Sequence, residues 1–105
     1  MIRIENKKYY CGDGVYIGRP SLLGNQFRIG KDGTREDVIR LYRAWLWEQI
    51  RRRAAIYHEL KRLARIASRG DLPLICWCKE RDKDVHSHGD ILKRAVEWLN
   101  SKDGQ

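Results

Sequence analysis

The chain has 105 residues, of which 42% are hydrophobic and 34% are charged. This length allows one domain with one modest core, and the composition is typical of a folded protein rather than a disordered one. No apolar run approaches the roughly 18 residues of a membrane helix, and the first residues lack the apolar stretch of a signal peptide. We therefore expect a cytoplasmic protein. The formal net charge of +8 favours anionic partners such as nucleic acid or phosphorylated small molecules, although a basic, well-solvated surface would produce the same number.

The first third of the chain predicts short strands separated by turns. Ile2 and Ile4 alternate with polar residues, and a second β-prone run covers residues 15–17. Glycines and a proline break the chain over residues 18–25, and residues 27–29 predict a third short strand. Three cysteines in such a protein argue against a disulfide framework, and Cys11 is predicted to be a small buried hydrophobic residue.

The rest of the chain predicts helices around one apolar strand. Residues 34–37 form a variant of the capping box in which the Thr34 hydroxyl starts a helix. Helical periodicity continues to Gly70, which is too long for one helix, so we expect two helices with a break near residues 51–54. Residues 72–77 predict a buried strand, and a second capping-box variant at residues 87–90 starts the last helix. The predicted fold is a single small α/β domain over residues 1–105, a short sheet with helices packed on it in the order β-β-(β)-α-α-β-α.

Two thiols and two imidazoles lie around the end of that apolar strand. Cys76 and Cys78 are followed by His86 and His88, and zinc favours such a mixed set of four ligands. The C-x-C spacing is less usual for a structural zinc site than C-x₂₋₄-C. Three interpretations therefore remain open: a zinc site, a catalytic thiol or imidazole, or cysteines that pack against helices beside solvated histidines.

A glycine-rich loop follows the second β-prone run directly. Its candidate ligand-binding residues are Gly18, Arg19, Gly24 and Asn25, because glycines let a ligand approach the backbone and arginine binds phosphate through two hydrogen bonds. The loop matches neither a Walker motif nor G-x-G-x-x-G, so an ordinary turn with a surface arginine is the alternative.

The start of the last helix carries the candidate catalytic residues, His88 and Asp90, with Gly89 between them as a further ligand-binding position. The amides of a helix start favour anions, and the helix dipole there favours a neutral imidazole. Asp90 could serve as a general base or a metal ligand, but its simpler role is to cap the helix.

The central helical region is basic, with ten Lys or Arg residues against four Asp or Glu between residues 35 and 69. Arg51, Arg52 and Arg53 are its densest point, and Trp47 lies nearby. Charge interleaved with aromatic rings is typical of nucleic-acid binding, whereas a solvated helix face is the default interpretation.

Five motifs in order resemble the family called domain of unknown function 4326, which is common in bacteriophages and bacteria. They are VYIGRPS at residues 15–21, GNQF at 24–27, GTRE at 33–36, LICWC at 74–78 and HGDIL at 88–92. The family has no established activity to carry over. The resemblance implies that four of their elements meet at one end of the sheet: Gly18-Arg19, Gly24-Asn25, Cys76 with Cys78, and His88 with Asp90. Two positions depart from the family pattern: Gln26 replaces a proline, and Ser87 replaces a cysteine, which weakens a strict zinc site unless His86 substitutes as a ligand.

The leading hypothesis is a protein that binds a nucleotide or another phosphate-bearing ligand at the carboxyl end of a strand, as a binding protein or as an enzyme. Two alternatives stay open. One is a zinc-stabilised domain without catalysis, and the other is a basic nucleic-acid-binding accessory protein of viral origin that acts in the host cytoplasm.

Overall fold

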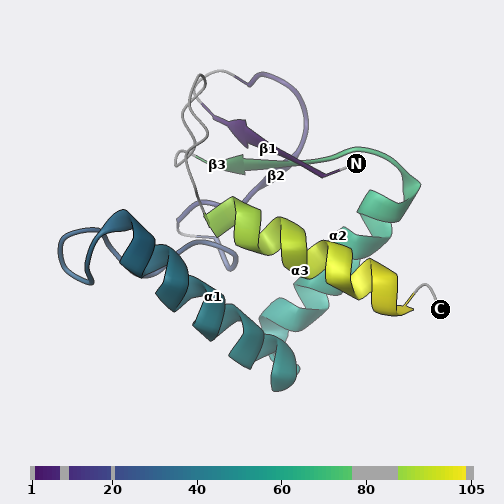
Figure 1. Ribbon diagram of the computed structural model, residues 1–105. Helices are drawn as coiled ribbons and strands as arrows, with labels where there is room; N and C mark the ends of the chain where they lie inside the picture. Colours follow the sequence, from purple (N-terminus) through teal and green to yellow (C-terminus); the bar gives the residue numbers. More distant parts are fainter. Residues whose placement is uncertain (1, 8–9, 20, 77–87, 104–105) are drawn as a thin grey trace.

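The computed structural model describes residues 2–7, 10–19, 21–76 and 88–103 of the chain. Within these residues the elements follow the predicted order of a small α/β domain (Figure 1). They are β1 (Ile2–Asn6), β2 (Val15–Tyr16), α1 (Arg35–Arg51), α2 (Ala55–Arg69), β3 (Leu72–Cys76) and α3 (His88–Asp103).

The sheet is parallel and has the strand order β1-β3-β2. The strand β3 lies in the centre because it is apolar along its whole length, as strands buried on both faces are. Ile2 and Ile4 of β1 pair with Leu72 and Leu74 of β3. On the other side β2 contributes only two residues, of which Val15 also pairs with Leu74.

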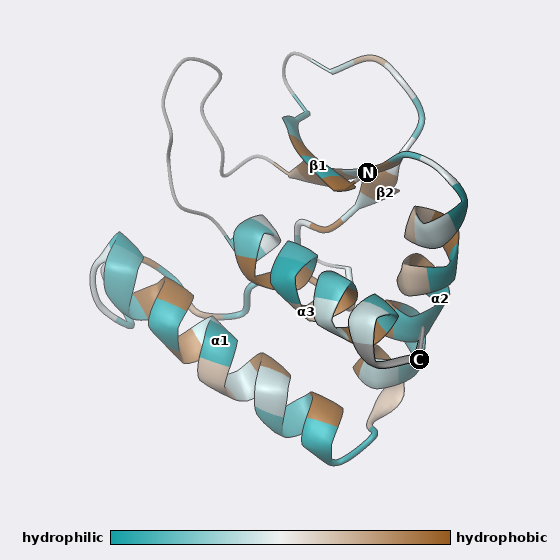
Figure 2. Ribbon diagram, turned by 45° about the vertical axis from the view of Figure 1, so that its right-hand side comes forward, coloured by the Kyte–Doolittle hydropathy of each residue, from teal (hydrophilic) through white to brown (hydrophobic). Residues whose placement is uncertain are grey.

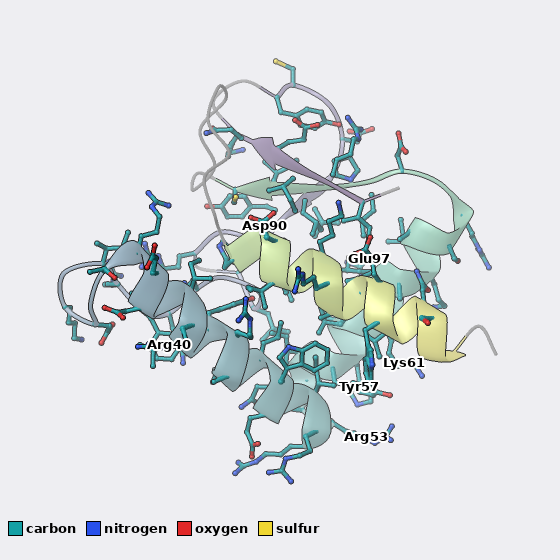
Figure 3. The ribbon with its side chains drawn as sticks, viewed as in Figure 1. Arg40, Arg53, Tyr57, Lys61, Asp90 and Glu97 are labelled. Atoms are coloured by element: carbon teal, nitrogen blue, oxygen red, sulfur yellow. The ribbon has the colours of Figure 1, made fainter. Side chains whose placement is uncertain are left out.

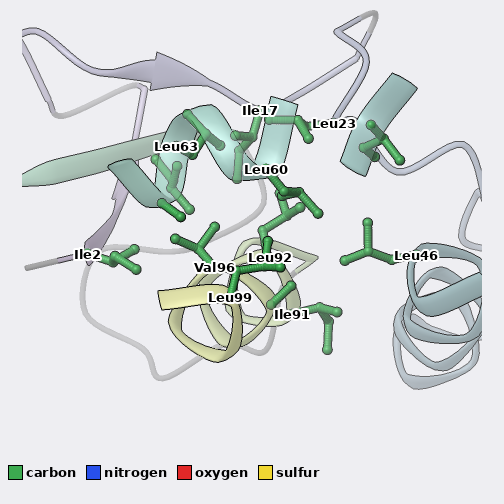
Figure 4. Close-up of a cluster of buried hydrophobic side chains, with 14 of the residues drawn as sticks. Ile2, Ile17, Leu23, Leu46, Leu60, Leu63, Ile91, Leu92, Val96 and Leu99 are labelled. Atoms are coloured by element: carbon green, nitrogen blue, oxygen red, sulfur yellow. The ribbon is translucent and has the colours of Figure 1, made fainter. Parts of the chain in front are cut away.

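The two faces of the sheet are covered differently. The helices gather on one side, where Leu72, Leu74 and Cys76 enter the common core, and the helix surfaces turned away from it are mostly hydrophilic (Figure 2). On the opposite face the connection between β1 and β2 packs closely, since a Cβ on Gly14 would lie 2.8 Å from the Pro73 carbonyl oxygen and from Ile75 Cδ1. The core therefore lies between the sheet and the helices, and Figure 4 shows its aliphatic centre.

The helix α1 begins where the sequence predicts. The Thr34 hydroxyl accepts a hydrogen bond from the Asp37 amide, and the Asp37 carboxylate accepts one from the Thr34 amide at 2.9 Å, which completes a capping box. These two bonds satisfy backbone groups that a helix start leaves without partners. The bond from the Thr34 amide is the largest cause of a lowered pKa of the Asp37 carboxyl, and a bond of 3.0 Å that the Thr34 hydroxyl donates to the same carboxylate lowers this pKa further.

The predicted break between the two long helices is confirmed at residues 52–54. Arg53 adopts a left-handed conformation with φ of 54°, its amide donates to the Ile50 carbonyl, and the Ala54 amide donates to the Gln49 carbonyl, each at 3.1 Å. This is the Schellman ending of a helix, in which glycine is usual at the left-handed position. The arginine found there carries a backbone strain that glycine would avoid.

Two expectations for the amino-terminal third are wrong. Residues 27–29 form no strand, because their backbone groups are used in local turns: the Phe27 amide donates to the Asn25 side chain and the Arg28 amide to the Asp32 side chain. Cys11 is exposed rather than buried, because the connection between β1 and β2 that carries it is exposed over residues 11–14. Trp77 and Ser87 lie outside the described residues.

No helix in the described part of the chain is both long and apolar enough to cross a membrane.

Candidate functional site

A cavity of about 420 Å³ opens at the carboxyl end of β2, beside the first turns of α1 and α3. In open α/β sheets ligands bind at this edge, because the loops that leave the strands create a crevice there. The lining combines polar, aromatic and aliphatic side chains from residues far apart in the sequence. Its residues are Tyr16, Gly18, Arg19, Asn25, Phe27, Arg28, Ile29, Arg35, Val38, Ile39 and His88.

All the charged side chains in the described lining of this cavity are positive. Three arginines line it: Arg19 from the loop after β2, Arg28 from the turn before α1, and Arg35 from the first position of α1. None of the described residues that line the cavity is acidic. Guanidinium groups that converge on one space suit a ligand with several oxygen acceptors, such as a phosphate group.

The loop that carries Arg19 is held tightly by its own backbone. The Ser21 amide donates to the Gly18 carbonyl at 2.9 Å, and the Gly24 amide donates to the Ser21 carbonyl at 3.0 Å. A Cβ on Gly24 would lie 3.0 Å from the Arg19 nitrogen and from the Gly18 carbonyl, so only glycine fits there without a shift. Outside the loop, the Tyr16 hydroxyl donates to the Arg19 carbonyl at 3.0 Å. The Arg19 backbone is therefore fixed before any ligand arrives.

Asn25 lines the cavity and also organises the chain that leads to α1. Its side-chain oxygen accepts a hydrogen bond from the Phe27 amide at 2.9 Å, and its side-chain amide donates to the Val38 carbonyl at 3.4 Å. The side chain thus joins the loop to the second turn of α1. Because its side chain makes both of these hydrogen bonds, Asn25 is a positioning residue for the cavity.

His88 connects the other side of the cavity to the core. Its side chain is only 1% exposed, its Nε2 lies 2.7 Å from the Ile17 carbonyl oxygen, and its ring meets the Tyr42 ring edge-on at 5.2 Å. A carbonyl oxygen can only accept, so Nε2 carries a proton and donates. Burial lowers the pKa of His88, and the positive charge of Arg19 lowers it further, against the opposing effects of the Ile17 hydrogen bond and Asp90. His88 is accordingly neutral at neutral pH, with the proton on Nε2.

The structure brings several of the predicted residues together and separates others. Gly18, Arg19, Asn25 and His88 line the same cavity, and Gly24 supports the loop from behind.

Gly89 faces the sheet rather than the cavity, since a Cβ on it would lie 3.1 Å from Ile4 Cγ2 and from Ile17 Cδ1. Asp90 lies on the first turn of α3, partly buried (Figure 3), and is not among the residues that line the cavity.

Only part of the predicted set of zinc ligands lies among the residues that the structure describes. Cys76 is fully buried in the core at the end of β3, whereas Cys78 and His86 lie outside the described residues. Among the residues that are described, no three His, Cys, Asp or Glu side chains are grouped so that they could hold a metal ion. The four-ligand set stays a prediction.

Two of the three cavity arginines, Arg28 and Arg35, are not among the ligand-binding residues that the sequence predicts. The sequence places Arg28 in a predicted strand and Arg35 at a predicted helix start. For Arg35 the sequence does contain a signal. The helix dipole disfavours a cation at the first helical position, so an arginine there indicates a role other than stabilising the helix. For Arg28 no local signal exists, because only the fold carries it to the cavity.

The fold and the site define a small α/β protein with a cationic cavity at the carboxyl edge of a three-stranded parallel sheet. A family model described as Domain of unknown function (DUF4326) matches residues 2–98, and the chain belongs to this family. Neither the curated proteins nor the solved structures gave a match.

Proposed function

We propose that the protein binds a phosphate-bearing ligand in the cavity at the end of β2. The observation that carries the proposal is the convergence of Arg19, Arg28 and Arg35 on one cavity, with no acidic residue in its described lining. Several guanidinium groups around one space offer a phosphate more charge-assisted hydrogen bonds than a single arginine does. The helix start of α1 contributes less, since Thr34 and Asp37 already occupy backbone groups there.

The remaining lining favours a nucleotide over inorganic phosphate. A volume of about 420 Å³ lies in the range of small-molecule sites. Tyr16 and Phe27 offer aromatic surface for a base, and Val38 and Ile39 offer an apolar floor. A site that combines a few convergent charged groups with apolar walls is typical of cofactor and nucleotide pockets.

In this proposal His88 is a positioning residue for the loop that carries Arg19. Its neutral ring donates to the Ile17 carbonyl and so links the start of α3 to the backbone just before Arg19. Asp90 and Gly89 support the start of the same helix. Acid–base catalysis by His88 and Asp90 stays a prediction, and the binding proposal does not depend on it.

The test is calorimetric titration of the whole protein with inorganic phosphate, AMP and ATP at fixed ionic strength. We expect the nucleotides to bind more tightly than inorganic phosphate. Arg19→Ala should reduce nucleotide affinity at least tenfold while the melting temperature stays unchanged, since the Arg19 side chain is exposed. Arg43→Ala removes the same charge from an exposed position of α1 outside the cavity and should leave affinity within twofold. Equal losses in both variants, or no binding of any of the three probes, would overturn the proposal.

A further inference from the structure

A second cavity, of about 570 Å³, lies at the far end of the helical layer, where the last turns of α1 and α3 meet the start of α2. Its walls are aromatic, from Trp47, Trp98 and Tyr57, and its charged residues are Arg51, Arg53 and Lys61. No acidic residue belongs to its described lining. This cavity shares no residue with the one at the end of β2.

The two indole rings provide a stacking surface. Trp47 and Trp98 meet edge to face, with ring centroids 5.3 Å apart and planes at 85°. Trp98 is 41% exposed, so it combines a fixed neighbour with an accessible ring. An accessible indole offers a flat surface on which a planar ligand can stack.

The cations of the cavity are arranged around Tyr57. The Arg53 guanidinium lies 5.2 Å from the centre of that ring and donates a hydrogen bond of 2.9 Å to its hydroxyl, and the Lys61 ammonium lies 5.7 Å from the ring centre. Figure 3 labels the three side chains at the end of the molecule where α1 gives way to α2. Arg51, the third cation of the described lining, donates to Glu48 instead. Arg53 and Lys61 are therefore the two cations that lie against an aromatic wall of the cavity.

The backbone at Arg53 supports a functional reason for its side chain. Its left-handed φ of 54° closes α1 in the place where glycine is usual, and glycine would be less strained. The arginine instead places a guanidinium on Tyr57 at the mouth of the aromatic cavity.

We infer that this cavity is a binding site for single-stranded nucleic acid, in which a base stacks on Trp98 and neighbouring phosphates contact Arg53 and Lys61. Aromatic rings beside cations, on a chain of net charge +8, match how proteins bind single strands without reading their sequence. The three cations exclude an aromatic cage for a cationic ligand. The inference is independent of the proposed nucleotide site, because the two cavities lie at opposite ends of α1.

The test is fluorescence anisotropy of a labelled ten-residue oligothymidylate, titrated with the whole protein at several salt concentrations. We expect Trp98→Ala and Lys61→Gln each to weaken binding at least fivefold, and Lys61→Gln to reduce the slope of log affinity against log salt by about 0.7. Arg53→Gly should also weaken binding at least fivefold, and it should fold because glycine suits the left-handed conformation.

The matched control is Arg65→Gln, which removes one charge from an exposed position of α2 outside the cavity and should leave affinity within twofold. Arg43→Ala, at an exposed position of α1 outside both cavities, should do the same. An equal loss for Arg65→Gln would show diffuse charge attraction and overturn the inference. So would equally tight binding of a polyglutamate peptide, since that would make the site one for acidic polypeptides, and so would the absence of oligonucleotide binding at low salt.

Discussion

Protonation of His88 should destabilise the fold as the pH falls below 6.5. The ring is only 1% exposed, its Nε2 donates to the Ile17 carbonyl, and burial lowers its pKa below the ordinary value of 6.5. In the unfolded chain the imidazole regains its ordinary pKa. Between the folded and the unfolded pKa the unfolded chain therefore binds more protons, and the free energy of unfolding must fall as the pH is lowered through 6.5.

The size of the effect follows from proton linkage. One proton contributes a slope of at most about 1.4 kcal/mol per pH unit, so acidification from pH 7.5 to 5.5 costs up to about 1.4 kcal/mol. In a domain of this size that lowers the melting temperature by about 4–8 °C per kcal/mol. The pKa values of the Asp37 and Glu48 carboxyls are lowered too, but they affect stability in a more acidic range. Their contributions to the free energy of unfolding are lost only as the pH falls below the ordinary pKa values of 3.8 and 4.5.

Chemical denaturation between pH 5.5 and 7.5 measures this slope in the natural protein and in His88→Gln. Glutamine cannot titrate, but its amide can reach the Ile17 carbonyl. The variant should therefore be less stable at pH 7.5 by about 1 kcal/mol, because it loses the ring contact with Tyr42. The difference between the two proteins should shrink as the pH falls. Parallel stability curves for the two proteins would refute the argument that His88 is the group that titrates.

Three further substitutions test the packing around the site by thermal unfolding. Gly24→Ala should lower the free energy of unfolding by about 1–3 kcal/mol, because the new Cβ would press on the peptide bond between residues 18 and 19. The control Gly70→Ala should be neutral, because its Cβ would meet nothing within 4 Å. Equal effects of the two substitutions would contradict the close approach at Gly24. Thr34→Ala should lose about 1 kcal/mol through its missing helix cap, while Thr34→Ser should lose less than half of that; an unchanged alanine variant would mean that the capping box adds nothing. Tyr42→Phe should lose about 1–3 kcal/mol, because a buried backbone carbonyl loses the hydroxyl that donates to it at 2.6 Å; a neutral result would show that this carbonyl finds another donor.

The elements of this fold were predictable where local chemistry decides them. The Thr34 cap, the apolar run of β3 and the end of the first long helix depend on neighbours within a few residues, and all three are present in the structure. The strand predicted at residues 27–29 does not form, and the reason is again local chemistry. Its β-prone side chains compete with Asn25 and Asp32, whose side chains bind the backbone amides of Phe27 and Arg28.

The site was predictable only in part, because its residues meet through the fold. Arg19 and His88 stand out in the sequence beside glycines, and the structure places both at one cavity. Arg28 and Arg35 reach the same cavity only because the turns before α1 carry them there. The predicted zinc set depends on Cys78 and His86, so metal analysis of the purified protein is its direct test.

The helix α1 sets the spacing between the two cavities. Its residues 35–39 border the cavity at β2 and its residues 47–51 border the aromatic cavity, so the centres of these two helix segments lie roughly 18 Å apart along the helix axis. Ligands in the two cavities therefore do not compete for space. A ligand with two binding groups gains from engaging both only if its linker spans that distance, and the gain in apparent affinity falls again as the linker grows longer. In a series of two-headed ligands with linkers of increasing length, the apparent affinity should therefore be greatest for the linker that just spans the two cavities.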